Sequence, residues 1–170
     1  TKIVCAEGDC GACTVLATNL VERKSEIKSI NSCIVNVSQM HGQILMTIEH
    51  LGRFSEDSLT LVQKKMIQCH GSQCGFCTPG FVVALTGALQ ARLEKGSASK
   101  MNSQQVKNAL TGNLCRCTGY QPIIEAAKSI PIEEFQSLKK TWGLPKDIMK
   151  LKSIIKMGLH VQNNEFEFFA

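Results

Sequence analysis

Residues 5–13 read CAEGDCGAC and place three cysteines within nine residues. Cys5, Cys10 and Cys13 have the Cys-x4-Cys-x2-Cys spacing that, together with one distant cysteine, can hold a [2Fe-2S] cluster. Cys33 is the next cysteine along the chain and is the expected fourth ligand. Because thiolates ligate metals, this segment predicts a metal centre at the start of the sequence.

Small residues surround these thiols and determine how the loop could hold an anionic centre. Gly8 and Gly11 allow positive φ angles and a close approach of the main chain, so a concave run of N–H groups can face the sulfurs. Zinc is the main competing interpretation, but zinc sites usually combine two short Cys-x2–4-Cys segments. A three-plus-one distribution fits a plant-type ferredoxin cluster better. Buried, inert thiols are the third alternative.

Four further cysteines form two close pairs, Cys74 with Cys77 and Cys115 with Cys117. Cysteines this close in sequence form poor disulfides, because the intervening loop is too short for relaxed geometry. A shared metal centre is therefore favoured, although a two-plus-two distribution suits zinc as well as iron. Cys69, the ninth cysteine, is expected to be a small buried apolar residue rather than a ligand.

Composition limits the classes to which this chain can belong. With 170 residues, of which 44% are hydrophobic and 5% aromatic, it can form one ordinary domain or two small ones. No apolar run reaches the roughly 18 residues of a membrane span and no signal peptide is visible, so we expect a cytoplasmic protein without a membrane partner. The net charge is +5, and lysines cluster at 139–156 without interleaved aromatics beyond Trp142, so no nucleic-acid partner is expected. No Ser/His/Asp set, phosphate loop or acid pair stands out, and no catalytic residue is predicted.

Apolar periodicity predicts strands first and helices afterwards. The runs at 13–21 and 44–51, with a shorter one at 26–30, are rich in apolar and β-branched residues and favour strands. From Asp57 the apolar residues recur at helical spacing, which predicts four helices. The expected N-caps or first-turn residues of these helices are Asp57 or Ser58, Thr78 with Pro79, Ser103, and Pro122.

Both close cysteine pairs directly precede a helix that begins with a proline. This rough repeat predicts two helical hairpins with pseudo-two-fold symmetry, which brings both pairs to one end of the domain. Helix N-termini favour an anionic thiolate centre there. Gly96 is an expected helix stop, and after Pro131 the helical pattern weakens into a lysine-rich linker.

Three motifs carry a family resemblance: EGDCGACTV at 7–15, HGSQCGFCTPGF at 70–81 and LTGNLCRCTGYQPIIEA at 110–126. Together they resemble the iron–sulfur region of the xanthine dehydrogenase/aldehyde oxidase family of molybdenum hydroxylases. The resemblance covers residue 1 to about residue 130 and is closest in appearance to the small subunit of bacterial xanthine dehydrogenases. It favours iron over zinc at both sites.

The resemblance implies an α+β fold. Residues 1–53 are expected to form a truncated β-grasp, plant-type ferredoxin domain, without the N-terminal stretch of about 35–40 residues that the family has. Residues 54–131 are expected to form an all-α four-helix [2Fe-2S]-binding domain, and 132–170 a linker toward a flavin domain. The implied ligands are Cys5, Cys10, Cys13 and Cys33 for the first [2Fe-2S] cluster, and Cys74, Cys77, Cys115 and Cys117 for the second.

The resemblance also implies a function. Single electrons would pass from a molybdopterin centre through the two clusters to FAD, which makes the chain an oxidoreductase component without a substrate-oxidising site. Gln73 is expected to contact the pterin, and Cys117 lies on the segment that faces it. The implied partners are a flavin domain in the same native chain and a large molybdopterin-binding subunit, in an oligomer. The alternatives are a stand-alone [2Fe-2S] ferredoxin or redox sensor, and a zinc-bound interaction module.

Overall fold

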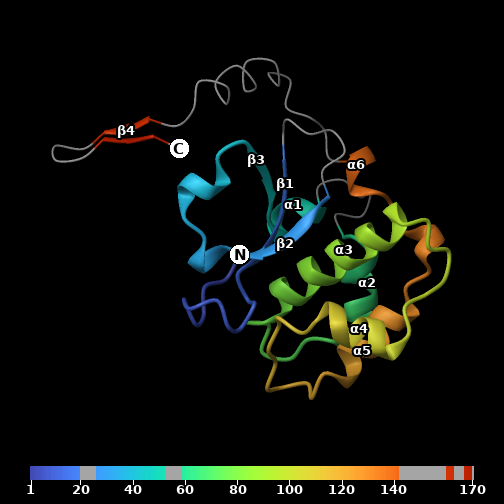
Figure 1. The fold of residues 1–170 in the computed structure, drawn as a ribbon. Helices are drawn as coiled ribbons and strands as arrows, with labels where there is room; N and C mark the ends of the chain where they lie inside the picture. Colours follow the sequence, from blue (N-terminus) through green and yellow to red (C-terminus); the bar gives the residue numbers. More distant parts are fainter. Residues whose placement is uncertain (20–25, 53–58, 142–159, 163–166, 170) are drawn as a thin grey trace.

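The computed structural model describes residues 1–19, 26–52, 59–141, 160–162 and 167–169 (Figure 1). Its fold is a small antiparallel sheet packed against helices, in the mixed α and β class that was predicted.

Three strands form the sheet: β1 (Thr14–Asn19), β2 (Lys28–Asn31) and β3 (Gln43–Met46). β1 is central and pairs antiparallel with both neighbours, in the order β2-β1-β3. Two short 3-10 turns, Ser32–Ile34 and Val37–Met40, connect β2 to β3. Each strand overlaps one of the three runs that the sequence predicted, and Asn31 of β2 and Gln43 of β3 lie one residue outside their runs.

One predicted strand is too long. The run at 44–51 was expected to be extended throughout, but β3 ends at Met46 and a short helix, α1 (Ile48–Leu51), follows. Leu51 is buried, and Ile48 packs against the same core. Residues three apart face the same side only in a helix, so a helical turn buries both side chains.

Four longer helices follow: α2 (Leu61–Gln68), α3 (Thr78–Glu94), α4 (Ser103–Ala109) and α5 (Gln121–Ser129). α3 starts at Thr78, so its N-cap is Cys77 rather than the expected Thr78. It ends just before Gly96, whose φ is 70°, as predicted. α2 begins instead after Thr60, in a capping box with Gln63, and the expected caps at 57 and 58 lie outside the described residues. The cap of α4 is Asn102 rather than the expected Ser103, because Asn102 Oδ1 accepts from the N–H of Gln105 at 2.9 Å.

α3 is the central element of the core. Figure 1 shows it between the sheet on one side and α2, α4 and α5 on the other. Leu16 of the sheet and Phe81, Leu85 and Leu89 of α3 are almost completely buried in a single core cluster. A Cβ added to Gly87 of α3 would lie 2.9 Å from Leu16 Cδ2, so a glycine here lets the sheet approach the helix closely.

The segment from residue 132 to residue 141 packs against the helices. It contains a 3-10 turn (Ile132–Glu134) and the short helix α6 (Leu138–Thr141). Phe135 and Leu138 are buried, and the Leu138 N–H donates to Oε1 of the buried Gln90 at 2.8 Å. Further on, β4 (His160–Gln162) and β5 (Glu167–Phe169) pair antiparallel. No helix in the described ranges combines the length and hydropathy that a membrane span needs.

Candidate metal centres

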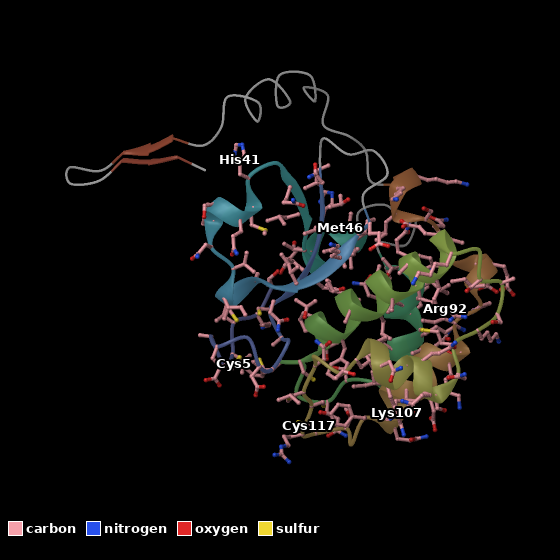
Figure 2. The ribbon with its side chains drawn as sticks, viewed as in Figure 1. Cys5, His41, Met46, Arg92, Lys107 and Cys117 are labelled. Atoms are coloured by element: carbon pink, nitrogen blue, oxygen red, sulfur yellow. The ribbon has the colours of Figure 1, made fainter. Side chains whose placement is uncertain are left out.

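All nine cysteines are free thiols, and eight of them lie in two sets. The first thiol set comprises Cys5, Cys10, Cys13 and Cys33. The second thiol set comprises Cys74, Cys77, Cys115 and Cys117. Figure 2 shows Cys5 of the first set and Cys117 of the second on separate loops at the same end of the molecule.

The register of β1 against β2 positions the first thiol set. Thr14 of β1 lies opposite Asn31 of β2, so Cys13, just before β1, and Cys33, just after β2, lie at the same end of the sheet. The side-chain amide of Asn31 donates to the main-chain oxygen of Gly8 at 2.6 Å. This bond ties the loop that carries the other two thiols back onto the sheet.

Main-chain N–H groups face the Cys5 sulfur, as the small residues of the loop predicted. The N–H groups of Glu7 and Cys10 lower the pKa of Cys5 to about 6, and Cys10 N lies 3.4 Å from Cys5 Sγ. The Cys10 side chain contributes to the same shift. A hydrogen bond with the Cys13 side chain raises the pKa of Cys33. The first thiol set is thus arranged as two pairs, Cys5 with Cys10 and Cys13 with Cys33.

The second thiol set lies on two loops that lead into helices. Cys77 is the N-cap of α3, and the loop with Cys115 and Cys117 ends where α5 begins. The Sγ atoms of Cys74 and Cys117 are 3.4 Å apart, and the hydrogen bond between them raises the pKa of Cys117. Burial raises the pKa of Cys77 to about 12, and a hydrogen bond with Cys115 adds to the shift. This set also forms two pairs.

Two polar side chains outside the thiol sets hold Cys115. Its N–H donates to the Tyr120 hydroxyl at 2.9 Å, and its Sγ lies 3.1 Å from Thr118 Oγ1. Burial opposes ionisation of Cys115, but the hydrogen bonds from Thr118, Cys77 and Cys117 together outweigh it and lower the pKa of this thiol. Sequence reasoning did not single out either residue, although both lie in the CRCTGY motif.

The arrangement in pairs fits a centre of two metal ions. Two thiolates on one tetrahedral metal, at about 2.3 Å from it, lie about 3.8 Å apart, which is close to the 3.4 Å between Cys74 and Cys117. Within the described residues, no group of three or more His, Cys, Asp or Glu side chains converges as one metal ion would require. A [2Fe-2S] cluster needs no such convergence, because its four thiolates are divided between two irons.

The two cysteine loops touch each other. The Leu114 N–H donates to the Cys10 main-chain oxygen at 3.0 Å, and Asn113 Nδ2 donates to the Gly11 oxygen at 3.0 Å. A Cβ added to Gly80 of α3 would lie 2.1 Å from that same Gly11 oxygen. The sequence predicted that the second set would meet at one end, but it did not predict this contact between the sets.

Comparison with known proteins supports an iron–sulfur domain in this chain. Residues 47–128 match the [2Fe-2S] binding domain. Xanthine dehydrogenase of Drosophila pseudoobscura pseudoobscura is 41% identical over 135 residues, which are 78% of this chain and 10% of that protein. Aldehyde oxidase 4 of Cavia porcellus is 38% identical over 131 residues, which are 76% of this chain and 9% of that protein.

A solved structure decides the family. The crystal structure of quinoline 2-oxidoreductase from Pseudomonas putida 86 has a TM-score of 0.64 and 30% identity to this chain, and the match covers 82% of this chain and 75% of that one. This chain belongs to the xanthine dehydrogenase/aldehyde oxidase family. It spans about a tenth of the length of the curated relatives.

Within the xanthine dehydrogenase/aldehyde oxidase family, whose members are oxidoreductases, this chain is the iron–sulfur part. The matched [2Fe-2S] binding domain contains the whole second thiol set, and the first set precedes it.

Three residues of interest differ in exposure. Gln73 and Cys117, expected to face a pterin, are both exposed, and Gln73 directly precedes Cys74. The side chain of Cys69 is half-buried and packs against the core, as expected for an apolar residue.

Proposed function

We propose that this chain is the electron-transfer module of a molybdenum hydroxylase, most simply a xanthine dehydrogenase. In this proposal the first and second thiol sets each hold one [2Fe-2S] cluster, and each cluster accepts and donates one electron at a time. Electrons arrive from a molybdopterin centre and leave to FAD.

The proposal rests on one observation about the thiols. Within each thiol set they are arranged as two pairs, and the loops that carry the two sets are in direct contact. Each set offers four thiols as two pairs, which is the ligand demand of two irons. Hydrogen bonds join the main chain at Cys10 to that at Leu114. Two redox centres in adjoining loops suit a relay better than a single-centre ferredoxin.

The finer fold assignment is also part of this proposal. Residues 1–53 form a β-grasp ferredoxin domain, residues 54–131 a four-helix domain, and residues 132–170 a linker toward a flavin domain. The strand order β2-β1-β3 and the placement of Cys13 directly before β1 support the first assignment. The packing of α2 to α5 around a shared core supports the second.

Exposed apolar side chains beside each thiol set support the proposal that partner domains bind there. Ile34 and Val37 follow Cys33 and are 58% and 85% exposed, and Phe76, between two thiols of the second set, is 60% exposed. Exposed apolar groups next to a functional site favour an interface. We assign the surface beside the first set to the flavin domain and that beside the second to the large molybdopterin-binding subunit.

Further assignments follow from this orientation. Gln73 and Cys117 face the pterin, because both are exposed at the second thiol set. The complete enzyme is a cytoplasmic oligomer, and neither nucleic acid nor a membrane is among its partners.

Iron and acid-labile sulfide analysis, combined with EPR of the reduced chain, tests this proposal. We expect about four irons and four sulfides per chain and two distinct [2Fe-2S] signals. Zinc without sulfide would contradict the proposal in favour of an interaction module. Two clusters in a chain that binds neither a flavin domain nor a molybdopterin subunit would instead indicate a stand-alone ferredoxin or redox sensor.

A further inference from the structure

Three polypeptide segments meet at the main-chain oxygen of Gly11, which belongs to the loop of the first thiol set. This oxygen accepts from Asn113 Nδ2 at 3.0 Å and from Thr14 Oγ1 at 2.5 Å. Gly80, in the first turn of α3, approaches so closely that its added Cβ would lie 2.1 Å from the same oxygen. The loop of the first set, the loop of the second set and α3 therefore share one packed junction.

Asn113 is the side chain that joins the two loops at this junction. It is only 5% exposed although it lies in a loop, and its main-chain N–H donates to Leu110 at 2.9 Å. Its amide reaches both the Gly11 oxygen and Thr14 Oγ1, the latter at 3.4 Å. A buried amide with partners about 100 positions away in sequence fixes one loop against the other.

The next residue completes a continuous bonded connection between the thiol sets. The Leu114 N–H donates to the oxygen of Cys10, and Leu114 is covalently joined to Cys115. From the Cys10 sulfur to the Cys115 sulfur, this route contains about ten covalent bonds and one hydrogen bond. A hydrogen bond couples two centres better than a gap between atoms does, so the position of Leu114 matters for transfer between them.

We propose that Asn113 is a positioning residue that holds the two cysteine loops together, so that the hydrogen bond from Leu114 to Cys10 couples the two centres. This inference rests on the proposed function, since it requires a centre at each thiol set. The transfer moves one electron between the centres and neither forms nor breaks a covalent bond nor moves a proton. The protein therefore controls the rate of this transfer through the distance between the two centres and the bonded connection that couples them. Asn113 fixes both, although it belongs to neither thiol set.

The test is low-temperature EPR of the fully reduced chain, in which two neighbouring paramagnetic centres split each other's signals. This dipolar splitting decreases with the cube of the separation. We compare the wild type with Asn113→Ala, which removes the side-chain amide, and with Asn113→Asp, which keeps its shape but cannot donate to Gly11. Asn108→Ala is the matched control, because Asn108 is an exposed asparagine of α4 whose side chain is bonded only to Gln104 in the contacts described.

The expected result is a narrower splitting in both Asn113 variants, with the iron content and the individual line positions unchanged. The control should keep the wild-type splitting. A splitting that is identical in wild type and Asn113 variants would overturn the inference while leaving the proposed function intact. A wild-type chain with one signal or none would instead refute the proposed function.

Hydrogen exchange of the wild type keeps the inference testable if the variants assemble poorly. Mass spectrometry that resolves single amides should show slow exchange at Leu114, because its N–H is bonded to the Cys10 oxygen. If this amide exchanges as fast as a free loop amide, the junction is open in solution and the inference is wrong.

Discussion

The contact between Gly80 and Gly11 predicts that a methyl group added at Gly80 pushes α3 away from the loop of the first thiol set. A Cβ on Gly80 would lie 2.1 Å from the Gly11 oxygen and 3.0 Å from Asn113 Nδ2. The oxygen belongs to the main chain and accepts two side-chain hydrogen bonds, so it cannot move away as a flexible side-chain tip would. Restoring ordinary contact requires the loop and the helix to move apart by more than about 1 Å.

The expected magnitude follows from two opposing terms. Overpacking of this kind typically costs about 1–3 kcal/mol, whereas replacing Gly by Ala within a helix gains up to about 1 kcal/mol. We therefore expect Gly80→Ala to lose about 1–2 kcal/mol of unfolding free energy. For a chain of this length, that loss lowers the thermal midpoint by about 2–8 °C.

Thermal unfolding measures this effect, followed by circular dichroism for the helices and by visible absorbance for the centres. Gly112→Ala is the matched control, because no atom lies within 4 Å of its added Cβ and its φ is outside the left-handed region. Its midpoint should change by no more than the equivalent of about 0.5 kcal/mol. If Gly80→Ala melts with the control, the close approach of α3 to the first loop is wrong.

Three further predictions concern single side chains. Thr118→Val removes the hydroxyl beside Cys115 Sγ, so the reduced second centre loses a hydrogen bond and its potential should fall by on the order of 20–60 mV in a redox titration. Gln90→Leu leaves a buried N–H of α6 without its acceptor, which should cost about 1–3 kcal/mol in thermal unfolding and speed tryptic cleavage of the segment after Pro131. The third prediction concerns the protein at pH 7 after iron removal. Cys5, with a pKa of about 6, is then mainly thiolate, whereas Cys77, with a pKa of about 12, stays protonated. Because the thiolate is the reactive form, iodoacetamide should alkylate Cys5 before Cys77, as followed by mass spectrometry.

Matched variants control the first two of these experiments. Thr111→Val removes an exposed hydroxyl that bonds only helix carbonyls in the described contacts, and it should leave the potential unchanged. Gln104→Leu replaces an exposed glutamine of α4 and should leave tryptic cleavage unchanged. An unaltered potential in Thr118→Val, an unaltered cleavage rate in Gln90→Leu, or equal labelling of Cys5 and Cys77 would each contradict the corresponding contact.

The sequence predicted the two thiol sets because metal chemistry restricts cysteine spacing. The pairs Cys74 with Cys77 and Cys115 with Cys117 are too close in sequence for relaxed disulfides, which favours a shared metal centre. The contact between the sets could not be predicted in this way. It depends on Asn113 and Gly11, which are 102 positions apart, and nothing in the local pattern relates a loop amide to a distant main-chain oxygen.

Apolar periodicity predicted the helices, but it did not predict the residues at which two of them begin. The caps at Thr60 and Asn102 both have a glutamine three positions later, which is the capping-box pattern. That signal was present in the sequence, but Asp57 or Ser58 was predicted in place of Thr60, and the neighbouring Ser103 in place of Asn102. The short helix at Ile48–Leu51 had no comparable signal, because an apolar run of this length suits a strand equally well and packing on the core decides.

EPR of three single cysteine variants tests the central claim of two separate centres most directly. Cys13→Ala should abolish one [2Fe-2S] signal and Cys77→Ala the other, each with a loss of about half the iron. Cys69→Ala is the control, because this half-buried thiol packs against the core outside both sets, and it should keep both signals. If Cys13→Ala and Cys77→Ala remove the same signal, or if Cys69→Ala removes either, the division into two four-thiol centres is wrong.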